Sequence, residues 1–347
     1  MENDKDALIL VTGGTGFVGS YLLRYLRQVG YSRIRALRRP GSPIDLVAPV
    51  NDQIEWIEGD LLDVFSLEEA IRDVQQVYHC AALVSFNPAD RDLMLQVNRN
   101  GTANVVNSCL HAGVNKLVHV SSIAAIGRDR RSTEISEQTK WQNSPDNTPY
   151  AVSKFQAEQE VWRGQAEGLQ VAVVNPSVIL GAGFWNSGPQ QVFKMAWDEF
   201  PFYPVGSSGF VDVRDVVRFM VQLMESDITG QRYLLNGENT SYRDVQTAIA
   251  KVLGKRPPSK AISPRLARWA ARLEWLRSKL GGKAPLITKD AALTTSLSYR
   301  YLNDRSRRAF DFEYTPLQQT IEETANLFRT AAREDFSPRV LSFKALS

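Results

Sequence analysis

The sequence predicts an α/β protein built on a doubly wound parallel sheet. Three observations carry this prediction: a short apolar run leads into the glycine-rich stretch 12–19, a segment of helical periodicity follows it, and apolar runs then alternate with helical patterns to about residue 180. Strands that alternate with helices are typical of parallel sheets with right-handed crossovers. The 347 residues are enough for such a sheet and a smaller second lobe.

The elements follow in order along the chain. Residues 7–11 read as a buried parallel strand, and apolar residues at helical spacing follow the glycines. Beyond residue 180 the chain becomes rich in glycine, proline and aromatic residues, which indicates that it leaves the sheet. The further strands are expected at 32–37, 53–58, 75–80, 116–122 and 169–180, with helices around 66–73 and 89–111.

Composition excludes several classes of protein. The chain is 43% hydrophobic and 23% charged with a formal net charge of +3, so no overall field favours nucleic acid. Cys80 and Cys109 lie in apolar stretches, which favours reduced thiols and a cytoplasmic location. The acidic N-terminus and the lack of an 18-residue apolar run predict neither secretion nor a membrane span. The three histidines have no cysteine or carboxylate cluster at ligand spacing, so no metal site is expected.

The stretch TGGTGFVG, residues 12–19, joins the first predicted strand to the first helix. Gly13 permits a tight turn, Gly16 lets backbone approach a pyrophosphate, and Gly19 lets the helix pack closely on the strand. Glycine-rich turns are common, but a strand before the turn and a helix after it predict a dinucleotide at the helix N-terminus. The remaining cofactor contacts expected in this turn are Thr15, Phe17 and Val18.

The second strand ends in two arginines, Arg38 and Arg39. An acidic residue at this place accepts the ribose 2′-hydroxyl of NAD, whereas an arginine accommodates the 2′-phosphate of NADP. The alternative is two solvated arginines at a strand end. Because they follow a glycine turn at this spacing, they predict NADP(H).

Two later strand ends complete the predicted cofactor site. Asp60 and Leu61 follow the third strand, where they would border the adenine. Ala81 and Ala82 follow the fourth strand and are small enough to let the cofactor lie against backbone. These positions belong to the carboxyl edge of the sheet, where open parallel sheets place their ligands.

A tyrosine and a lysine stand four positions apart in the stretch TPYAVSK, as Tyr150 and Lys154. Thr148 as cap and Pro149 at the first helical position predict a helix that puts both side chains on one face. A phenol has a pKa near ~10, and a nearby ammonium favours the phenolate. Ser122, at the end of the fifth strand, would hydrogen-bond a carbonyl oxygen. The alternative is that Tyr150 and Lys154 are a chance pair on a solvated helix and that Ser122 is an ordinary serine at a strand end.

These motifs occur together in one order: TGGTGFVG, the arginine pair, GDLLD, AALVSF, NRNGT, VSS, YAVSK and NPSVILG. The chain thereby resembles the extended short-chain dehydrogenases/reductases of the NAD-dependent epimerase/dehydratase superfamily, in the branch of dihydroflavonol 4-reductase and 3β-hydroxysteroid dehydrogenase. The resemblance covers about residues 7–235, with a weaker echo in PLITKD near 285. It implies a Rossmann-type sheet.

The resemblance also implies roles for particular residues. Ser122, Tyr150 and Lys154 match the catalytic hydroxyl, acid and lysine of these enzymes, and Ser121 is the neighbouring alternative for the hydroxyl. Lys154 is further expected to hold the nicotinamide ribose, with Pro176 and Val178 near the nicotinamide ring.

Two positions depart from relatives in the superfamily. Dehydratases carry an acidic pair just after the catalytic hydroxyl, whereas Ile123 and Ala124 stand there in this chain. Many epimerases bind NAD through an acidic residue at the second strand, where this chain has Arg38. Both departures speak against those activities.

These observations predict an NADPH-dependent reductase of a ketone or aldehyde, with Tyr150 as proton donor. Aromatic residues crowd the stretch 180–210, and Phe184, Trp185 and Phe193 are expected to line a pocket for a bulky, apolar substrate: long-chain, sterol-like or aromatic. The alternative for these aromatics is the core of the second lobe. The competing functions are a nucleotide-sugar epimerase and a non-catalytic NADP-sensing scaffold, although a scaffold need not retain all three catalytic residues.

The predicted domains are an NADP-binding unit over 1–180, to which 209–236 returns, and a discontinuous substrate lobe over 181–208 and 237–347. Within that lobe, residues 263–283 form a basic amphipathic pattern with two tryptophans. Such helices lie on anionic membranes, although a packed surface helix is the plainer alternative. The expected partner is a small-molecule carbonyl compound, and a homodimer stays open.

Overall fold

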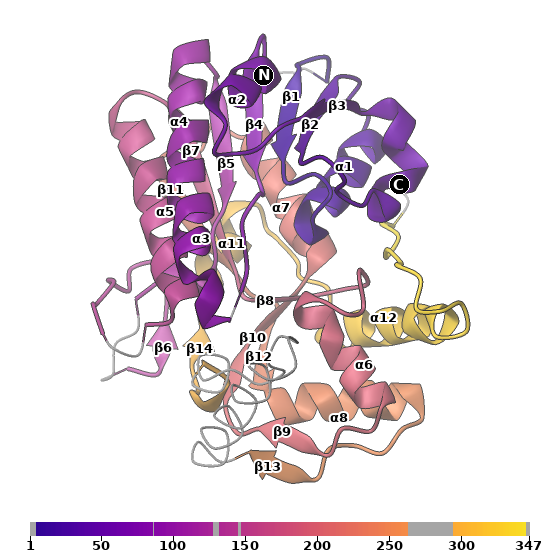
Figure 1. Cartoon of the computed structure of the whole chain (residues 1–347). Coiled ribbons are helices and arrows are strands. Elements are labelled where there is room, and N and C mark those ends of the chain that lie inside the picture. The colour runs from indigo at the N-terminus through magenta and orange to yellow at the C-terminus, as the bar shows by residue number, and fades with distance from the viewer. Residues whose placement is uncertain (1–4, 86, 128–131, 145–146, 263–293, 345–347) are drawn as a thin grey trace.

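The computed structural model describes residues 5–85, 87–127, 132–144, 147–262 and 294–344 (Figure 1). A seven-stranded parallel sheet runs in the order β3-β2-β1-β4-β5-β7-β11. The order reverses at β1, next to β4, as in a doubly wound sheet with its ligand crevice at the carboxyl edge. The strands are β1 (Ile9–Thr12), β2 (Ile34–Arg38), β3 (Glu55–Glu58), β4 (Gln76–His79), β5 (Lys116–Val120), β7 (Gln170–Pro176) and β11 (Gln231–Leu235).

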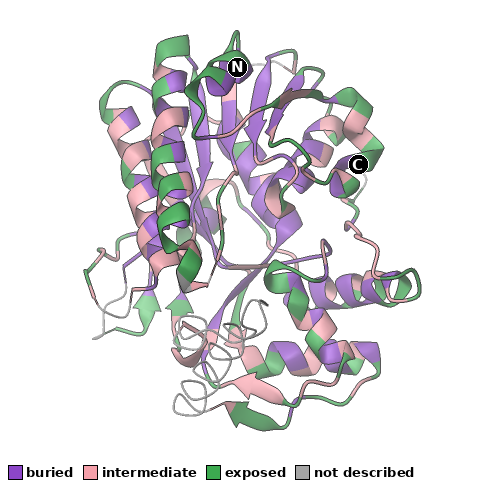
Figure 2. Cartoon of the chain, in the orientation of Figure 1, coloured by how far each residue is buried: buried purple, intermediate pink, exposed green. Residues whose placement is uncertain are grey.

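Helices cover both faces of this sheet. Side chains alternate along a strand, so Ile9 and Val11 of β1 enter one core while Leu8 and Leu10 enter the other. Figure 2 shows the strands as the buried centre between helices whose outer faces are exposed. The first core contains residues of α1 (Phe17–Gln28) and α7 (Val213–Glu225), and the second those of α2 (Val64–Ile71), α4 (Gly101–Ala112) and α5 (Pro149–Ala166).

The predicted doubly wound sheet is therefore confirmed, with one strand drawn too long. The stretch 169–180 is two strands rather than one, β7 and β8 (Val178–Leu180). The chain changes partners between them: Ser177 N donates to Leu235 O at 2.9 Å, beside the central sheet, whereas β8 pairs with β10 (Ser207–Asp212). Because both halves are apolar, hydrophobicity alone does not reveal this break.

Among the described residues, the second lobe consists of short strands and helices. The strands β8 and β10 form a sheet with β12 (Glu238–Ser241), and β9 (Phe202–Pro204) pairs with β13 (Lys260–Ile262). The helices are α6 (Gln191–Trp197), α8 (Tyr242–Leu253) and α12 (Leu317–Ala331). Other described elements are α3 (Arg91–Leu95), the π-helix Gln96–Asn100, α11 (Asp304–Ala309) and the paired strands β6 (Glu134–Ile135) and β14 (Arg300–Tyr301). Short 3-10 helices occupy Asp45–Gln53, Pro88–Asp90, Ile123–Ala125 and Gly188–Gln190.

Residues 209–236 divide between the sheet and the lobe. Strand β10 pairs with β8 and β12, whereas α7 packs on the central strands and β11 pairs with β7. The basic stretch 263–283 and PLITKD lie outside the described residues. Within the described ranges, none of the helices combines the length and the apolar character that crossing a membrane requires.

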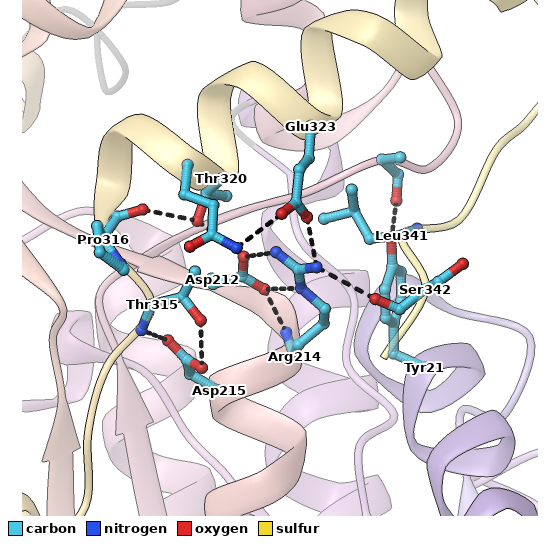
Figure 3. A network of polar contacts seen from close by, with 12 residues as sticks. Tyr21, Asp212, Arg214, Asp215, Thr315, Pro316, Thr320, Glu323, Leu341 and Ser342 are labelled. Atoms are coloured by element: carbon cyan, nitrogen blue, oxygen red, sulfur yellow. Dashed lines mark hydrogen bonds and ion pairs between the residues drawn. The ribbon is translucent and has the colours of Figure 1, made fainter. Parts of the chain in front are cut away.

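A buried polar network joins α7 to α12 at the boundary with the lobe (Figure 3). Arg214 contacts both carboxylate oxygens of Asp212, through Nε at 3.0 Å and Nη2 at 2.7 Å. The same guanidinium reaches Glu323 Oε2 on α12 at 2.5 Å and the backbone oxygen of Ser342 at 3.1 Å. Thr320 donates to Asp212 at 2.7 Å. The chain's last described segment is thereby fastened to both parts of the fold.

Tyr21 makes a second connection of this kind. Its hydroxyl donates to Ala182 O at 2.9 Å and accepts from Leu341 N at 2.7 Å (Figure 3). The first of these groups follows β8, and the second belongs to the C-terminal segment. Helix α1 therefore holds both the entry to the lobe and the chain that returns from it.

Candidate active site

The glycine turn has the geometry that its spacing predicts. Gly13 has φ +71°, and a Cβ there would lie 2.7 Å from the backbone of Ala81. A Cβ on Gly19 would lie 2.1 Å from Gly13 O, so α1 packs directly on the turn. No side chain caps the first residue of α1, where Gly16 is exposed, which leaves backbone N–H groups available to an anion. This turn fits a dinucleotide pyrophosphate.

The first residue of α1 packs against the start of the lobe. The ring of Phe17 would contact a Cβ on Gly181 at 3.3 Å and one on Gly183 at 3.2 Å, so it packs against the segment that follows β8. Thr15 and Val18 are partly exposed. The residue that begins α1 thus packs directly on the start of the lobe.

Arg38 lies at the carboxyl end of β2, next to the turn. Its guanidinium stacks over Trp56, with a centroid distance of 5.4 Å, and pairs with Glu58 Oε1 at 3.2 Å. Its Nε is buried and has no hydrogen-bond partner among the residues that the structure describes. Arg39 is exposed. The Arg38 side chain is 27% exposed, so part of it is accessible at the carboxyl end of β2.

The other predicted cofactor positions differ in exposure. Asp60 is partly exposed and its carboxylate accepts from Leu62 N at 2.9 Å, whereas Leu61 is buried against Gly101. Ala81 and Ala82 follow β4 and keep exposed surface. Pro176 is buried at the end of β7, and Val178 is partly exposed in β8.

The structure brings Ser122, Tyr150 and Lys154 together at the carboxyl edge of the sheet. Thr148 caps α5 by accepting from Ala151 N at 3.2 Å, and Pro149 occupies the first turn, as predicted. Tyr150 and Ser122 are joined by a side-chain hydrogen bond. Lys154 is 2% exposed and donates from Nζ to Val120 O at 2.9 Å. The phenol, the hydroxyl and the ammonium therefore meet where β5 ends.

Burial and charge set the protonation of these groups. Burial raises the pKa of Tyr150, while its hydrogen bond with Ser122 acts in the opposite direction. Burial lowers the pKa of Lys154 to about 8, and the Glu158 carboxylate opposes that change. Tyr150 therefore keeps its proton until a reaction removes it. A cation nearby is then needed to stabilise the phenolate that forms.

Sequence reasoning missed several buried residues of this site. Glu158 is 1% exposed and lies one turn after Lys154, where it accepts from Ser121 and Asn175. Asn98 sits in the π-helix, receives Leu83 N at 2.7 Å and donates to Ser153 Oγ at 2.9 Å. A carboxylate at helical spacing from Lys154, on a face otherwise buried, was the available signal for Glu158.

The aromatic residues predicted to line the substrate pocket lie mostly in the core. Trp185 is 1% exposed and Phe193 fully buried, and both rings pack on Phe328 of α12. Phe184 is partly exposed. The structure thus places Trp185 and Phe193 in the interior of the lobe and leaves Phe184, of the three, with accessible surface.

Histidines and cysteines are not arranged as metal ligands. The two ring nitrogens of His79 hydrogen-bond Thr12 Oγ1 at 2.7 Å and Thr102 Oγ1 at 2.9 Å. Burial lowers the pKa of His79 to about 3. Cys80 and Cys109 are both free thiols. Within the described part of the chain, no group of three or more histidine, cysteine or acidic residues is placed to hold a metal ion.

Comparison with known families matches residues 9–235 to the profile of the NAD dependent epimerase/dehydratase family. The chain belongs to this family. The matched span runs from the first residue of β1 to the last of β11, so it begins and ends with the central sheet. The motif residues described above therefore lie within the part of the chain that defines an epimerase/dehydratase family member.

Among relatives in the epimerase/dehydratase family, sterol demethylase protein B of Methylococcus capsulatus is 33% identical over 76% of this chain and 80% of its own length. A putative dihydroflavonol 4-reductase of Synechocystis is 28% identical over 92% of this chain and 94% of its own. The crystal structure of gox2253 is 28% identical, has a TM-score of 0.80, and covers 94% of this chain and 99% of that one.

Proposed function

We propose that this protein is an NADPH-dependent reductase of a ketone or aldehyde. The observation that carries the proposal is the meeting of Tyr150, Ser122 and Lys154 at the sheet edge that also holds the glycine turn. Lys154 bonds Val120 at the end of β5, His119 of β5 pairs with His79 of β4, and His79 pairs with Thr12 of β1, the residue before Gly13. The proton donor and the dinucleotide turn are therefore neighbours across β1, β4 and β5.

Each residue of the group has a distinct task in this reaction. A bound nicotinamide supplies the hydride. Tyr150 gives its proton to the carbonyl oxygen, and Ser122 donates a hydrogen bond to the same oxygen as negative charge develops there. The ammonium of Lys154 stabilises the phenolate that Tyr150 becomes. Ile123 and Ala124 supply no acidic pair, which favours reduction over dehydration.

The preference for NADPH rests on Arg38. Its partly exposed side chain and its place next to Leu37, which pairs with Thr12 just before the glycine turn, suit a 2′-phosphate. Glu58 competes for the same guanidinium, but the side chains are 27% and 54% exposed, and such surface pairs contribute at most about 1 kcal/mol. A phosphate with two negative charges would displace this contact. The same arginine argues against an NAD-dependent sugar epimerase.

The substrate class we propose is a bulky, apolar carbonyl compound. Two of the relatives bear names that refer to such molecules, a sterol demethylase component and a putative dihydroflavonol reductase. In this chain, Phe184 and Val178 are partly exposed apolar residues on the segments that enter the lobe. An apolar wall here would exclude water from the carbonyl during transfer.

A panel of sterol-like, aromatic and long-chain ketones and aldehydes tests the activity, with NADPH oxidation followed by absorbance and products by mass spectrometry. Tyr150→Phe deletes the proton but keeps the ring, so turnover should fall roughly 100- to 10,000-fold while NADPH still binds. Tyr25→Phe, on α1 where the ring packs on Phe343, is the matched control and should leave turnover unchanged. Undiminished turnover in Tyr150→Phe would refute the assignment.

Cofactor preference is tested by binding. NADPH should bind at least about tenfold better than NADH, because one charge-assisted contact is worth roughly 1.5 to 3 kcal/mol. Arg38→Asp should abolish most of this preference, whereas Arg33→Asp, on an exposed arginine just before β2, should preserve it. Equal affinities of the two cofactors for the unchanged protein would disprove NADPH specificity without touching the role of Tyr150.

A further inference from the structure

A carboxylate is buried directly behind the catalytic helix face. Glu158 lies in α5 one turn beyond Lys154 and is 1% exposed. A buried charge is costly unless it is hydrogen-bonded and paired. Glu158 meets both conditions through four donors: Ser121 Oγ at 2.7 Å and Asn175 Nδ2 at 2.9 Å on Oε2, with Trp162 Nε1 at 3.2 Å and Arg232 Nη1 at 3.1 Å on Oε1.

One oxygen of Glu158 serves the strand end that carries Ser122. Ser121, which donates to Oε2, immediately precedes Ser122 in the chain. Asn175, which also donates to Oε2, donates from the same nitrogen to Ser122 O at 3.0 Å. Two tethers from one carboxylate oxygen therefore restrain the backbone on both sides of the Ser122 side chain.

The other oxygen joins α5 to the last strand of the sheet. Arg232 of β11 pairs with Glu158 Oε1 and also donates from Nε to Glu137 O at 3.0 Å. The carboxylate thus stands between two cations, Lys154 on the active-site side and Arg232 on the far side. Lys154 Nζ donates to Val120 O, and Glu158 acts on the lysine through its charge.

We propose that Glu158 is a positioning residue, which fixes Ser122 through Ser121 and Asn175 and whose negative charge keeps Lys154 protonated while Tyr150 gives up its proton. The proposal rests on the reductase function above. It assigns Glu158 no contact with substrate or cofactor. Its two tasks are separable, because one depends on the position of the carboxylate oxygens and the other on their charge.

The groups around Lys154 explain why this charge matters. Burial lowers the pKa of Lys154 to about 8, and Glu158 is the largest influence that raises it. The other titratable groups that face the lysine are Cys80 and His79 at β4, His119 of β5 and Tyr150 of its own helix. Burial keeps both histidines neutral, since it holds their pKa values well below 6.5. Without Glu158, Lys154 would lose its proton at a lower pH.

Glu158→Gln keeps the shape of the side chain and removes its charge. We expect kcat to fall roughly 10- to 100-fold and the alkaline fall of activity to begin about one pH unit lower. NADPH affinity, measured by fluorescence across pH 6 to 10, should also begin to weaken about one pH unit lower than in the unchanged protein. Glu160→Gln, on a neighbouring carboxylate that pairs with Arg163, is the control and should match the unchanged protein in both profiles.

Glu158→Asp retains the charge but withdraws it from Ser121 and Asn175. In this variant kcat should fall, whereas the alkaline fall of activity should begin at the same pH as in the unchanged protein. The result separates the positioning role from the charge role. It also tests the proposal if Glu158→Gln does not fold. The proposal would be overturned if Glu158→Gln had the same pH profiles of activity and of NADPH affinity as the unchanged protein. Because NADPH binding needs no turnover, failure of the reductase function would show as absent turnover with an intact binding profile.

Discussion

Two buried polar regions of this molecule use charge in opposite ways. At the junction of α7 and α12, Arg214 meets carboxylates on two sides, with contacts of 2.5 to 3.0 Å to Glu323 and Asp212, and its pKa is raised (Figure 3). At the catalytic edge, Lys154 bonds a backbone carbonyl, and burial lowers its pKa to about 8. The difference teaches that a structural charge is fully matched, whereas a charge held for chemistry is left partly uncompensated toward the space where a ligand binds.

Lys154→Met gives the largest expected effect. It removes a buried cation and keeps an unbranched side chain of similar length, so turnover should fall roughly 100- to 10,000-fold and NADPH binding should weaken. Stability should stay equal or rise, because an uncompensated buried charge costs free energy. Activity assays and thermal unfolding measure the two effects. A melting temperature several degrees lower would place Lys154 with the structural charges instead.

Asp212→Asn tests the opposite pattern at the junction. The change leaves the cap of α7 in place but removes one charge facing Arg214, and breaking such a buried pair costs about 3 kcal/mol. Denaturant unfolding should show this loss while turnover per folded molecule stays unchanged. Asp198→Asn, which breaks an exposed pair with Lys194, should cost less than about 1 kcal/mol. Equal costs for the two variants would remove the distinction between the regions.

Tyr21→Phe is expected to have the smallest effect of the three. It leaves Ala182 O and Leu341 N without the hydroxyl that joins them, which should cost roughly 1 to 3 kcal/mol. Tyr25→Phe, one turn along the same helix, is the matched control, since that ring packs on Phe343. Hydrogen exchange at Leu341 should accelerate in Tyr21→Phe alone. Unchanged exchange there would show that the C-terminal segment is held by Arg214 rather than by Tyr21.

The contrast between the regions also explains how far the sequence could be read. The Thr148 cap and the contact of Gly19 with Gly13 O are local, because the interacting residues lie within a few positions of each other, so their spacing predicts their geometry. The order of these motifs then predicts the sheet and the meeting of Ser122, Tyr150 and Lys154. Local patterns together with the family resemblance thus predict Ser122, Tyr150 and Lys154, but not Glu158 and Asn98, which hydrogen-bond residues around them.

Long-range partners escaped the same reasoning. Asp212 finds Thr320 across more than a hundred residues, and Glu158 finds Arg232 on a different element. Trp185 and Phe193 pack on Phe328, which no spacing connects to them. The break at Ser177 depends on which strand each half pairs with. Contacts of this kind are decided by tertiary packing, and an apolar or acidic residue has the same appearance in sequence wherever it ends up.

The route of the chain through the lobe determines how a chimera would have to be made. A donor lobe could not be attached at one crossover, because the chain leaves the sheet after β7, returns for α7 and β11, and departs again before α12. The C-terminal segment then comes back to α1, where Leu341 meets Tyr21. A transplanted lobe must therefore bring its own equivalents of Leu341 and of Glu323 and Ser342, which Arg214 contacts on α12 and the C-terminal segment. Exchanging the lobe to change substrate specificity therefore requires matched contacts at several boundaries, and the last of these boundaries lies on α1 at Tyr21.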